Sequence, residues 1–167
     1  QAFPEDWAGA TMNLASAYGN RIHGERGANV DKAIGLYEGC LAVYTQQAFP
    51  EKWATATMNL ANAYKDRIHG ERGANVDKAI GLYEECLTVY TQQAFPEKWA
   101  TATMNLANAY QGRIDGERGA NVDRAIGLYE KCLAVRTQQA FPEKWAMTTM
   151  NLAVAYSDRI HGERGAN

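Results

Sequence analysis

Residues 47–92 read QAFPEKWATATMNLANAYKDRIHGERGANVDKAIGLYEECLTVYTQ, and the chain repeats this sequence along its whole length. The segment QAFPE starts again at Gln1, Gln93 and Gln139, so the period is 46 residues without insertion or deletion. Of the 46 offsets, 35 carry the same residue in every copy. A fixed period of this length is typical of repeat arrays, in which stacked units bury a continuous core. We therefore divide the chain into repeats at 1–46, 47–92 and 93–138, with 139–167 as the first helix of a fourth.

Each repeat predicts two helices. Pro50 suits the first turn of a helix, where its missing N–H has no helical partner. Apolar residues then recur at spacings of three and four from Trp53 to Tyr64, which is the period of an amphipathic helix. We expect this helix to end at Gly70 and the second helix to start at Asn75 as its N-cap. The predicted fold class is all-α, a solenoid of stacked antiparallel helix hairpins.

The second helix carries two further features at fixed offsets. Cys40, Cys86 and Cys132 lie on its apolar face, so we expect buried thiols that act as small hydrophobic groups rather than nucleophiles. Their even spacing of 46 residues is neither a disulfide framework nor a zinc site, and it favours a reducing, cytoplasmic location. Gly35, Gly81 and Gly127 lie inside the helix, where each costs about 1 kcal/mol relative to Ala. We expect close approach of a neighbouring helix to explain them.

The composition excludes several classes of function. The chain has 17 Lys and Arg against 19 Asp and Glu, a net charge of −2, whereas nucleic-acid binders usually carry a basic excess. Helical spacing makes the aromatic rows core residues rather than base-stacking platforms. No apolar run approaches the roughly 18 residues that a membrane span needs. Every candidate catalytic residue repeats identically and no constellation converges, so we predict no enzyme activity, no cofactor and no metal.

Residues 59–64 read NLANAY and resemble the Asn-Leu-Gly-Asn-Ala-Tyr core of the tetratricopeptide repeat family, and Ala79-Ile80 followed by Tyr83 resembles its second helix. The match recurs in every copy, although Ala61 stands where the family usually has Gly and the period exceeds the usual 34. Longer-period relatives include kinesin light chain repeats and arrays in bacterial and fungal signalling proteins. The resemblance implies a right-handed superhelix that binds a protein or peptide partner on its concave face.

Positions that differ between copies indicate where such a surface would form. In the first helix they recur at spacings of seven, three and four, opposite the apolar stripe, and the resemblance places that side on the concave groove. Amides there suit hydrogen bonds to a peptide backbone. The predicted partner-binding residues are Thr55, Asn59, Asn62, Lys65, Asp66, Thr101, Asn105, Asn108, Gln111, Met147, Asn151 and Val154.

Three alternatives remain open. A solvent-facing side also varies when nothing constrains it. The closeness of the copies favours a structural spacer or self-association module within a larger signalling protein, and apolar stripes left uncovered at both ends predict end-to-end self-association. His23, His69 and His161, with Asp115 in the third repeat, share one offset. They suit solvated loop residues or cations at a helix C-terminus better than ligands of one ion, which must converge within about 2 Å of it.

Overall fold

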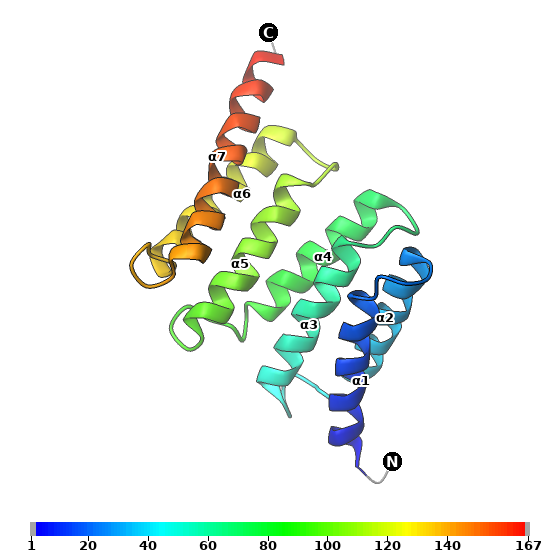
Figure 1. Cartoon of the computed structure of the whole chain (residues 1–167). Helices are drawn as coiled ribbons and strands as arrows, with labels where there is room; N and C mark the ends of the chain where they lie inside the picture. The colour runs from blue at the N-terminus through cyan, green and yellow to red at the C-terminus, as the bar shows by residue number, and fades with distance from the viewer. Residues whose placement is uncertain (1–2, 166–167) are drawn as a thin grey trace. The chain divides into compact units, whose positions relative to one another are not determined.

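The computed structural model describes the backbone of residues 3–165 and the side chains of residues 3–159; its secondary structure there is seven α-helices with no strand, which confirms the all-α prediction. Figure 1 labels the helices. They are α1 (Pro4–Gly19), α2 (Arg26–Leu41), α3 (Pro50–Lys65), α4 (Arg72–Cys86), α5 (Pro96–Gln111), α6 (Arg118–Val135) and α7 (Pro142–Gly165).

The chain forms two compact units, Gln1–Val89 and Tyr90–Asn167. In the first unit, α1 packs on α2, α2 on α3 and α3 on α4, and the first helices α1 and α3 also touch. In the second unit, α5 packs on α6, α6 on α7, and the first helices α5 and α7 touch. Each complete predicted repeat therefore contains one hairpin.

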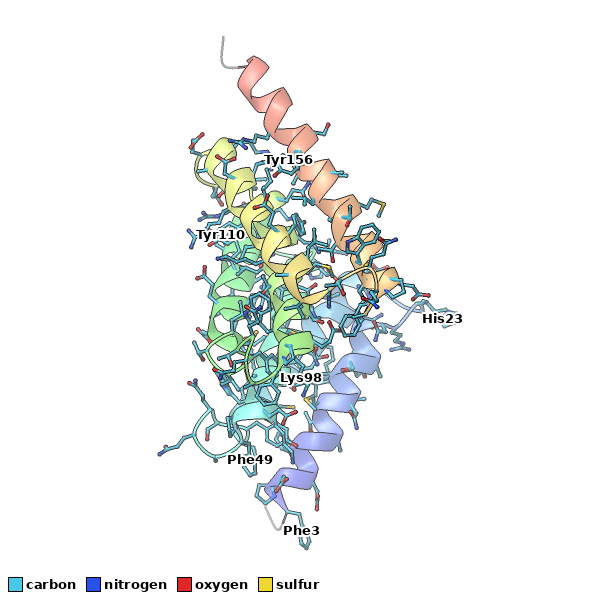
Figure 2. All side chains as sticks on the ribbon, turned by 90° about the vertical axis from the view of Figure 1, so that its left-hand side faces the viewer. Phe3, His23, Phe49, Lys98, Tyr110 and Tyr156 are labelled. Atoms are coloured by element: carbon cyan, nitrogen blue, oxygen red, sulfur yellow. The ribbon has the colours of Figure 1, made fainter. Side chains whose placement is uncertain are left out.

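The first helices start as the sequence predicts. Pro50 opens α3 and Phe49 stands at its N-cap without a side-chain cap, so a backbone bond from Trp53 N–H to the Phe49 carbonyl closes the first turn at 2.8 Å. The Phe49 ring meets Tyr44 edge-on, with centroids 5.6 Å apart, and anchors this start to the segment that follows α2. The corresponding residue of the first repeat, Phe3, points away from α1 and is 72% exposed (Figure 2).

The connection between the two helices of a hairpin differs from the prediction. The first helix α3 ends at Lys65, before Gly70, and α4 begins at Arg72, three residues before the expected cap Asn75. Asn75 is buried inside α4, and its Nδ2 donates a 2.9 Å hydrogen bond to the carbonyl of His69. Gly70 adopts φ +82°, which favours glycine, and makes the turn. The Asn therefore holds the connecting turn instead of capping the helix.

The last helix lacks this turn. Residues 158–162 correspond to a turn in the other three repeats, yet the backbone of α7 continues as helix to Gly165. The stop expected at Gly162, the counterpart of Gly70, is thus absent in α7. None of the helices in the described part of the chain combines the length and apolar character needed to cross a bilayer.

The core combines small side chains with buried tyrosines. In the first unit, Ala8, Cys40 and Tyr44 form a buried cluster, against which Met12 and Trp53 pack. All three cysteines are buried and unoxidised, which confirms their predicted place in the core. Burial raises the pKa of the Cys86 and Cys132 thiols to about 12, so neither is a thiolate at neutral pH.

The explanation expected for the glycines of the second helices is wrong. A Cβ atom built at Gly35, Gly81 or Gly127 would meet no other described side chain, and no backbone beyond its own helix turn, within 4 Å. No neighbouring helix approaches these positions, so close packing does not require glycine at any of them.

Candidate functional site

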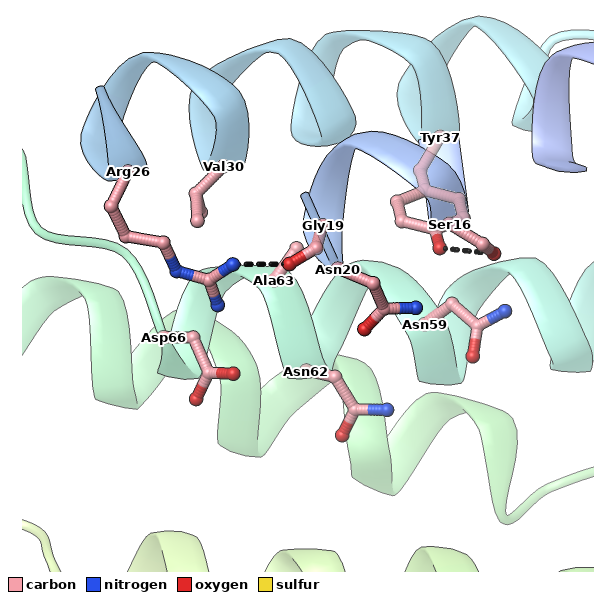
Figure 3. Close-up of a pocket in the computed structure, with 10 residues that line it drawn as sticks. All are labelled: Ser16, Gly19, Asn20, Arg26, Val30, Tyr37, Asn59, Asn62, Ala63 and Asp66. Carbon is pink, nitrogen blue, oxygen red and sulfur yellow. Dashed lines mark hydrogen bonds between the residues drawn. The ribbon is translucent and has the colours of Figure 1, made fainter. Parts of the chain in front are cut away.

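The first unit contains a polar pocket of about 190 Å³ where α1, α2 and α3 meet (Figure 3). The predicted residues Asn59, Asn62 and Asp66 line its α3 side. Its other lining residues are Ser16, Gly19 and Asn20 from the end of α1, Arg26, Val30 and Tyr37 from α2, and Ala63 from α3. The fold therefore brings the variable positions of repeat 1 against those of repeat 2.

Charged groups of both signs stand at this pocket. Arg26 donates from Nη1 to the carbonyl of Gly19, a bond drawn in Figure 3. The carboxylate of Asp66 lies 3.8 Å from Nζ of Lys65. Arg26 and Asp66 are both exposed, so a ligand can reach them from solvent. The pocket therefore offers a cation, a carboxylate and several amides within one small volume.

One group of variable positions has a structural role that the sequence argument missed. The offset occupied by Ser16, Asn62 and Asn108 faces the hydroxyl of a second-helix tyrosine in each complete repeat. The pairs are Ser16 with Tyr37 at 2.8 Å, Asn62 with Tyr83 at 2.6 Å and Asn108 with Tyr129 at 2.5 Å, measured between oxygen atoms. The premise that variable positions are released from packing is therefore wrong here, because each must supply a polar partner to a buried tyrosine.

Burial keeps the hydroxyl groups of these tyrosines protonated. Tyr83 and Tyr129 are fully buried side chains, and desolvation raises the pKa of both phenols far above the ordinary value. Burial also raises the pKa of Tyr37, and its hydrogen bond with Ser16 opposes that shift. Each hydroxyl therefore stays protonated at neutral pH.

In the second unit the corresponding space is filled by a side chain. Gln111 of α5 accepts from the hydroxyl of Tyr129 at 2.9 Å and donates from Nε2 to Asp158 Oδ2 at 3.0 Å. Arg118 reaches the same carboxylate oxygen at 3.1 Å, and Asn151 donates to Asn108 Oδ1 at 3.2 Å. The predicted residues Asn108, Gln111 and Asn151 thus belong to one network that joins α5, α6 and α7.

The remaining predicted residues lie elsewhere. Thr55 lines a separate pocket of about 470 Å³ with Met12, Phe49 and Lys52. Asn105 is half-buried on α5, while Met147 and Val154 are exposed on α7 at 43% and 50%. The hydroxyl of Thr101 accepts a 2.7 Å hydrogen bond from Arg136, so this predicted binding residue contacts the core.

Arg136 itself was missed by the sequence argument, although its offset changes from tyrosine to arginine between copies. It is 2% exposed, and its Nε lies 3.5 Å from Oε1 of Glu97. Its Nη1 lies 3.2 Å from the sulfur of Met104, while Lys144 pairs with the other oxygen of Glu97. A buried guanidinium thus replaces the buried ring of Tyr44 in the first repeat.

The histidine row makes a contact between repeats. His69 Nδ1 lies 2.6 Å from Asp31 Oδ2, and Arg67 Nε lies 2.7 Å from Oδ1 of the same carboxylate. In the second unit Arg159 pairs with Asp123 at 3.0 Å, while the side chain of His161 lies outside the described residues. His69 is therefore exposed but paired, and Arg67 makes an ion pair to a neighbouring repeat. Within the described residues, no three His, Cys, Asp or Glu side chains gather as metal ligands would.

Comparisons with known proteins identify the fold. No family model matches the chain, and no curated protein matches it in sequence. Among solved structures, the chain is similar to BtubC (BKLC) from P. vanneervenii, a kinesin light chain-like tetratricopeptide repeat protein, with a TM-score of 0.71 and 26% identity. The similarity covers 97% of this chain and 61% of that chain, so this chain spans less than two thirds of its length. The predicted fold class, a tetratricopeptide-like α-solenoid, is confirmed.

Proposed function

We propose that this chain is a protein–protein interaction scaffold, and that it binds a peptide or protein partner on the concave side formed by its first helices. The polar pocket between α1, α2 and α3 carries the proposal, because it gathers three predicted residues: Asn62 and Asp66, whose offsets vary between copies, and Asn59, which the family resemblance indicated. The tetratricopeptide-like fold supports a scaffold. We further propose a cytoplasmic location and no catalytic activity of its own.

The chemistry of the pocket suits a peptide. Asparagine side chains present both a donor and an acceptor, as a peptide backbone does, so they can pair with it in either direction. Asn59 and Asn20 line the pocket from opposite helices. Neither side chain makes a hydrogen bond or ion pair with the described residues, so both can be changed without disturbing a tyrosine partner.

The test is affinity capture from a lysate of the source organism, read by mass spectrometry. The baits are the wild type, the double variant Asn20→Ala/Asn59→Ala and the control Gly35→Ala, each confirmed to be folded by circular dichroism. We expect wild type and control to retain the same specific proteins and the double variant to lose them. Equal capture by all three baits would exclude this pocket as the recognition surface.

A second candidate function is self-association. It rests on apolar side chains exposed on the first helix of one unit and the last helix of the other. In the described residues these include Trp7 at 40% and Leu14 at 48% on α1, and Met150 at 62% and Val154 at 50% on α7. Burying such surface between copies would stabilise an assembly by roughly 25 cal/mol per Å² of apolar area.

A further inference from the structure

The two units differ in the residue that occupies one position at the end of a first helix. Gly19 of α1 and Gln111 of α5 share one offset in the repeat. Gln111 fills its space and bonds to Tyr129 and Asp158, whereas a Cβ atom built at Gly19 meets nothing within 4 Å. The pocket of the first unit thus lies where the second unit places a primary amide.

The groups that hold the Gln111 amide have counterparts around the empty space. Asp66 corresponds to Asp158, Tyr37 to Tyr129, and Arg26 to Arg118. All three line the pocket of the first unit. Asp158 is bonded by both Gln111 and Arg118, whereas among the described residues the Asp66 carboxylate has no bond to Arg26 and pairs with Lys65 alone, at 3.8 Å. The carboxylate that accepts from an amide N–H in the second unit is therefore available in the first.

Ser16 bears on whether the Tyr37 hydroxyl can donate a hydrogen bond to a ligand, as Tyr129 does to Gln111. In the second unit the Tyr129 hydroxyl lies within hydrogen-bond distance of Asn108 Oδ1 as well as of the Gln111 amide oxygen. In the first unit Ser16 replaces that asparagine and lies 2.8 Å from the Tyr37 hydroxyl, where either oxygen can be the donor. When Ser16 donates to Tyr37, the Tyr37 O–H is free to donate to a ligand carbonyl.

We propose that the pocket lined by Gly19, Tyr37 and Asp66 binds the primary-amide side chain of a glutamine from a partner. This inference rests on the proposed scaffold function and names the side chain that its groove recognises. The amide N–H₂ donates to Asp66 and the amide oxygen accepts from Tyr37. A glutamate side chain would set a second carboxylate beside Asp66, and an apolar side chain would leave Asp66 and Tyr37 desolvated without partners.

The experiment titrates the full chain with the N-methylamide of N-acetyl-L-glutamine and follows ¹H–¹⁵N spectra. The corresponding N-methylamides of glutamate, norleucine and lysine are the control probes, because in this series only the glutamine side chain offers a primary amide. We expect the glutamine probe alone to shift signals of the pocket residues. The variant Gly19→Gln supplies the amide from the chain itself and should weaken probe binding by about tenfold or more, as loss of two hydrogen bonds predicts. It should keep or raise stability.

Two further variants isolate the cause. Gly19→Ala makes the same glycine replacement but leaves the pocket open, so it should bind the probe like the wild type. Gln111→Gly opens the corresponding space of the second unit and should create a second set of shifts there. Equal binding by wild type and Gly19→Gln, or shifts of the same size with the lysine or norleucine probe, would overturn the proposal.

The outcome separates this inference from the scaffold function. The probe titration needs no partner protein, whereas the capture experiment needs no defined side chain. If the probe fails while capture still depends on Asn20 and Asn59, the groove is a recognition surface and the glutamine assignment is wrong. If the probe binds at the pocket while capture is indifferent to those residues, the amide site stands without the proposed partner surface.

Discussion

The hydroxyl of Tyr83 in α4 donates a 2.6 Å hydrogen bond to Oδ1 of Asn62 in α3. Tyr83 is 0% exposed, so its hydroxyl cannot turn to bulk water if that acceptor is removed. Asn62 is also a predicted partner-binding residue that lines the polar pocket. One residue of the proposed surface therefore also stabilises the hairpin, and the two roles must be separated by experiment.

Asn62→Ala should lower the free energy of unfolding by about 1–3 kcal/mol, because it leaves a buried hydroxyl without its acceptor. Adding Tyr83→Phe should recover part of this loss, since the second change removes the stranded donor. Urea unfolding of the two single variants and the double variant measures the coupling. The control Asn59→Ala should change stability little. Strict additivity of Asn62→Ala and Tyr83→Phe would show that the bond contributes nothing.

The buried charge of Arg136 predicts an asymmetric pair of variants. Glu97→Ala should destabilise the second unit by roughly 3 kcal/mol, because it leaves a guanidinium that is 2% exposed without its carboxylate. Arg136→Met removes the buried charge and should cost much less. Thermal unfolding compares the two, with Glu143→Ala at the same offset of the last repeat as the control. Equal losses for Glu97→Ala and Arg136→Met would contradict this account.

Two glycines should respond in opposite directions to replacement by alanine. Gly35 is exposed inside α2 with open space around it, so Gly35→Ala should stabilise the protein by about 1 kcal/mol through helix propensity. Gly70 has φ +82°, so Gly70→Ala forces a strained backbone and should destabilise by about 1 kcal/mol or more. Chemical unfolding measures both. A loss of stability in Gly35→Ala would mean that a neighbour does require glycine there.

The pairing of Asp31 predicts a pH dependence of stability. Hydrogen bonds from His69 and then Arg67 hold the pKa of the Asp31 carboxyl below its ordinary value of 3.8. The unfolded chain therefore binds this proton more readily, so the stabilisation is present above about pH 4 and is lost as the pH falls through the folded pKa. Because the pair is partly exposed, Asp31→Asn should cost no more than about 1 kcal/mol near neutral pH.

Urea unfolding of wild type and Asp31→Asn near neutral pH and near pH 3 checks this prediction. The difference between the two proteins should shrink at the acid pH. Asp6→Asn, which changes an exposed carboxylate on α1, controls for the general effect of removing a charge. A difference of the same size at both pH values would assign the effect of Asp31→Asn to something other than its charge.

Self-association should depend on the exposed apolar side chains of the last helix. Met150 and Val154 lie on α7 at 62% and 50% exposure, and charging both with Met150→Lys and Val154→Lys removes the surface that two copies would bury. Sedimentation velocity over a range of concentrations should show a rising average mass for the wild type and a constant monomer mass for the variant. A monomer at every concentration for the wild type would exclude the self-association module.

The sequence predicted the helices well and the turns poorly, for a physical reason. Helix period and Pro50 act locally, so the start of α3 and the buried faces follow from spacing alone. Asn75 has the composition of an N-cap, but its amide finds the carbonyl of His69 across the turn. Only the path of the connecting backbone, set by the positive φ of Gly70, decides between these two partners.

The residues of the candidate site were also predicted only in part. Variation between copies pointed to Asn62 and Asp66, the family resemblance added Asn59, and the fold places all three around one pocket. The variation did not reveal that Asn62 bonds to Tyr83, nor that Arg136 occupies a tyrosine's place in the core. Asn62 with Tyr83, and Arg136 with Glu97, are pairs of residues more than 20 positions apart. Neither helical periodicity nor helix propensity carries information about contacts at that separation.

The repeat, the helical class and the apolar faces follow from the order of residues alone, because a period of 46 residues and a spacing of three and four are properties of the chain. The pocket that Gly19 leaves open, and the corresponding space that Gln111 closes, depend on how the helices pack. The reason is that no single residue in the sequence indicates a cavity. It arises where side chains of three packed helices fail to meet, and it is visible only once those helices have been placed.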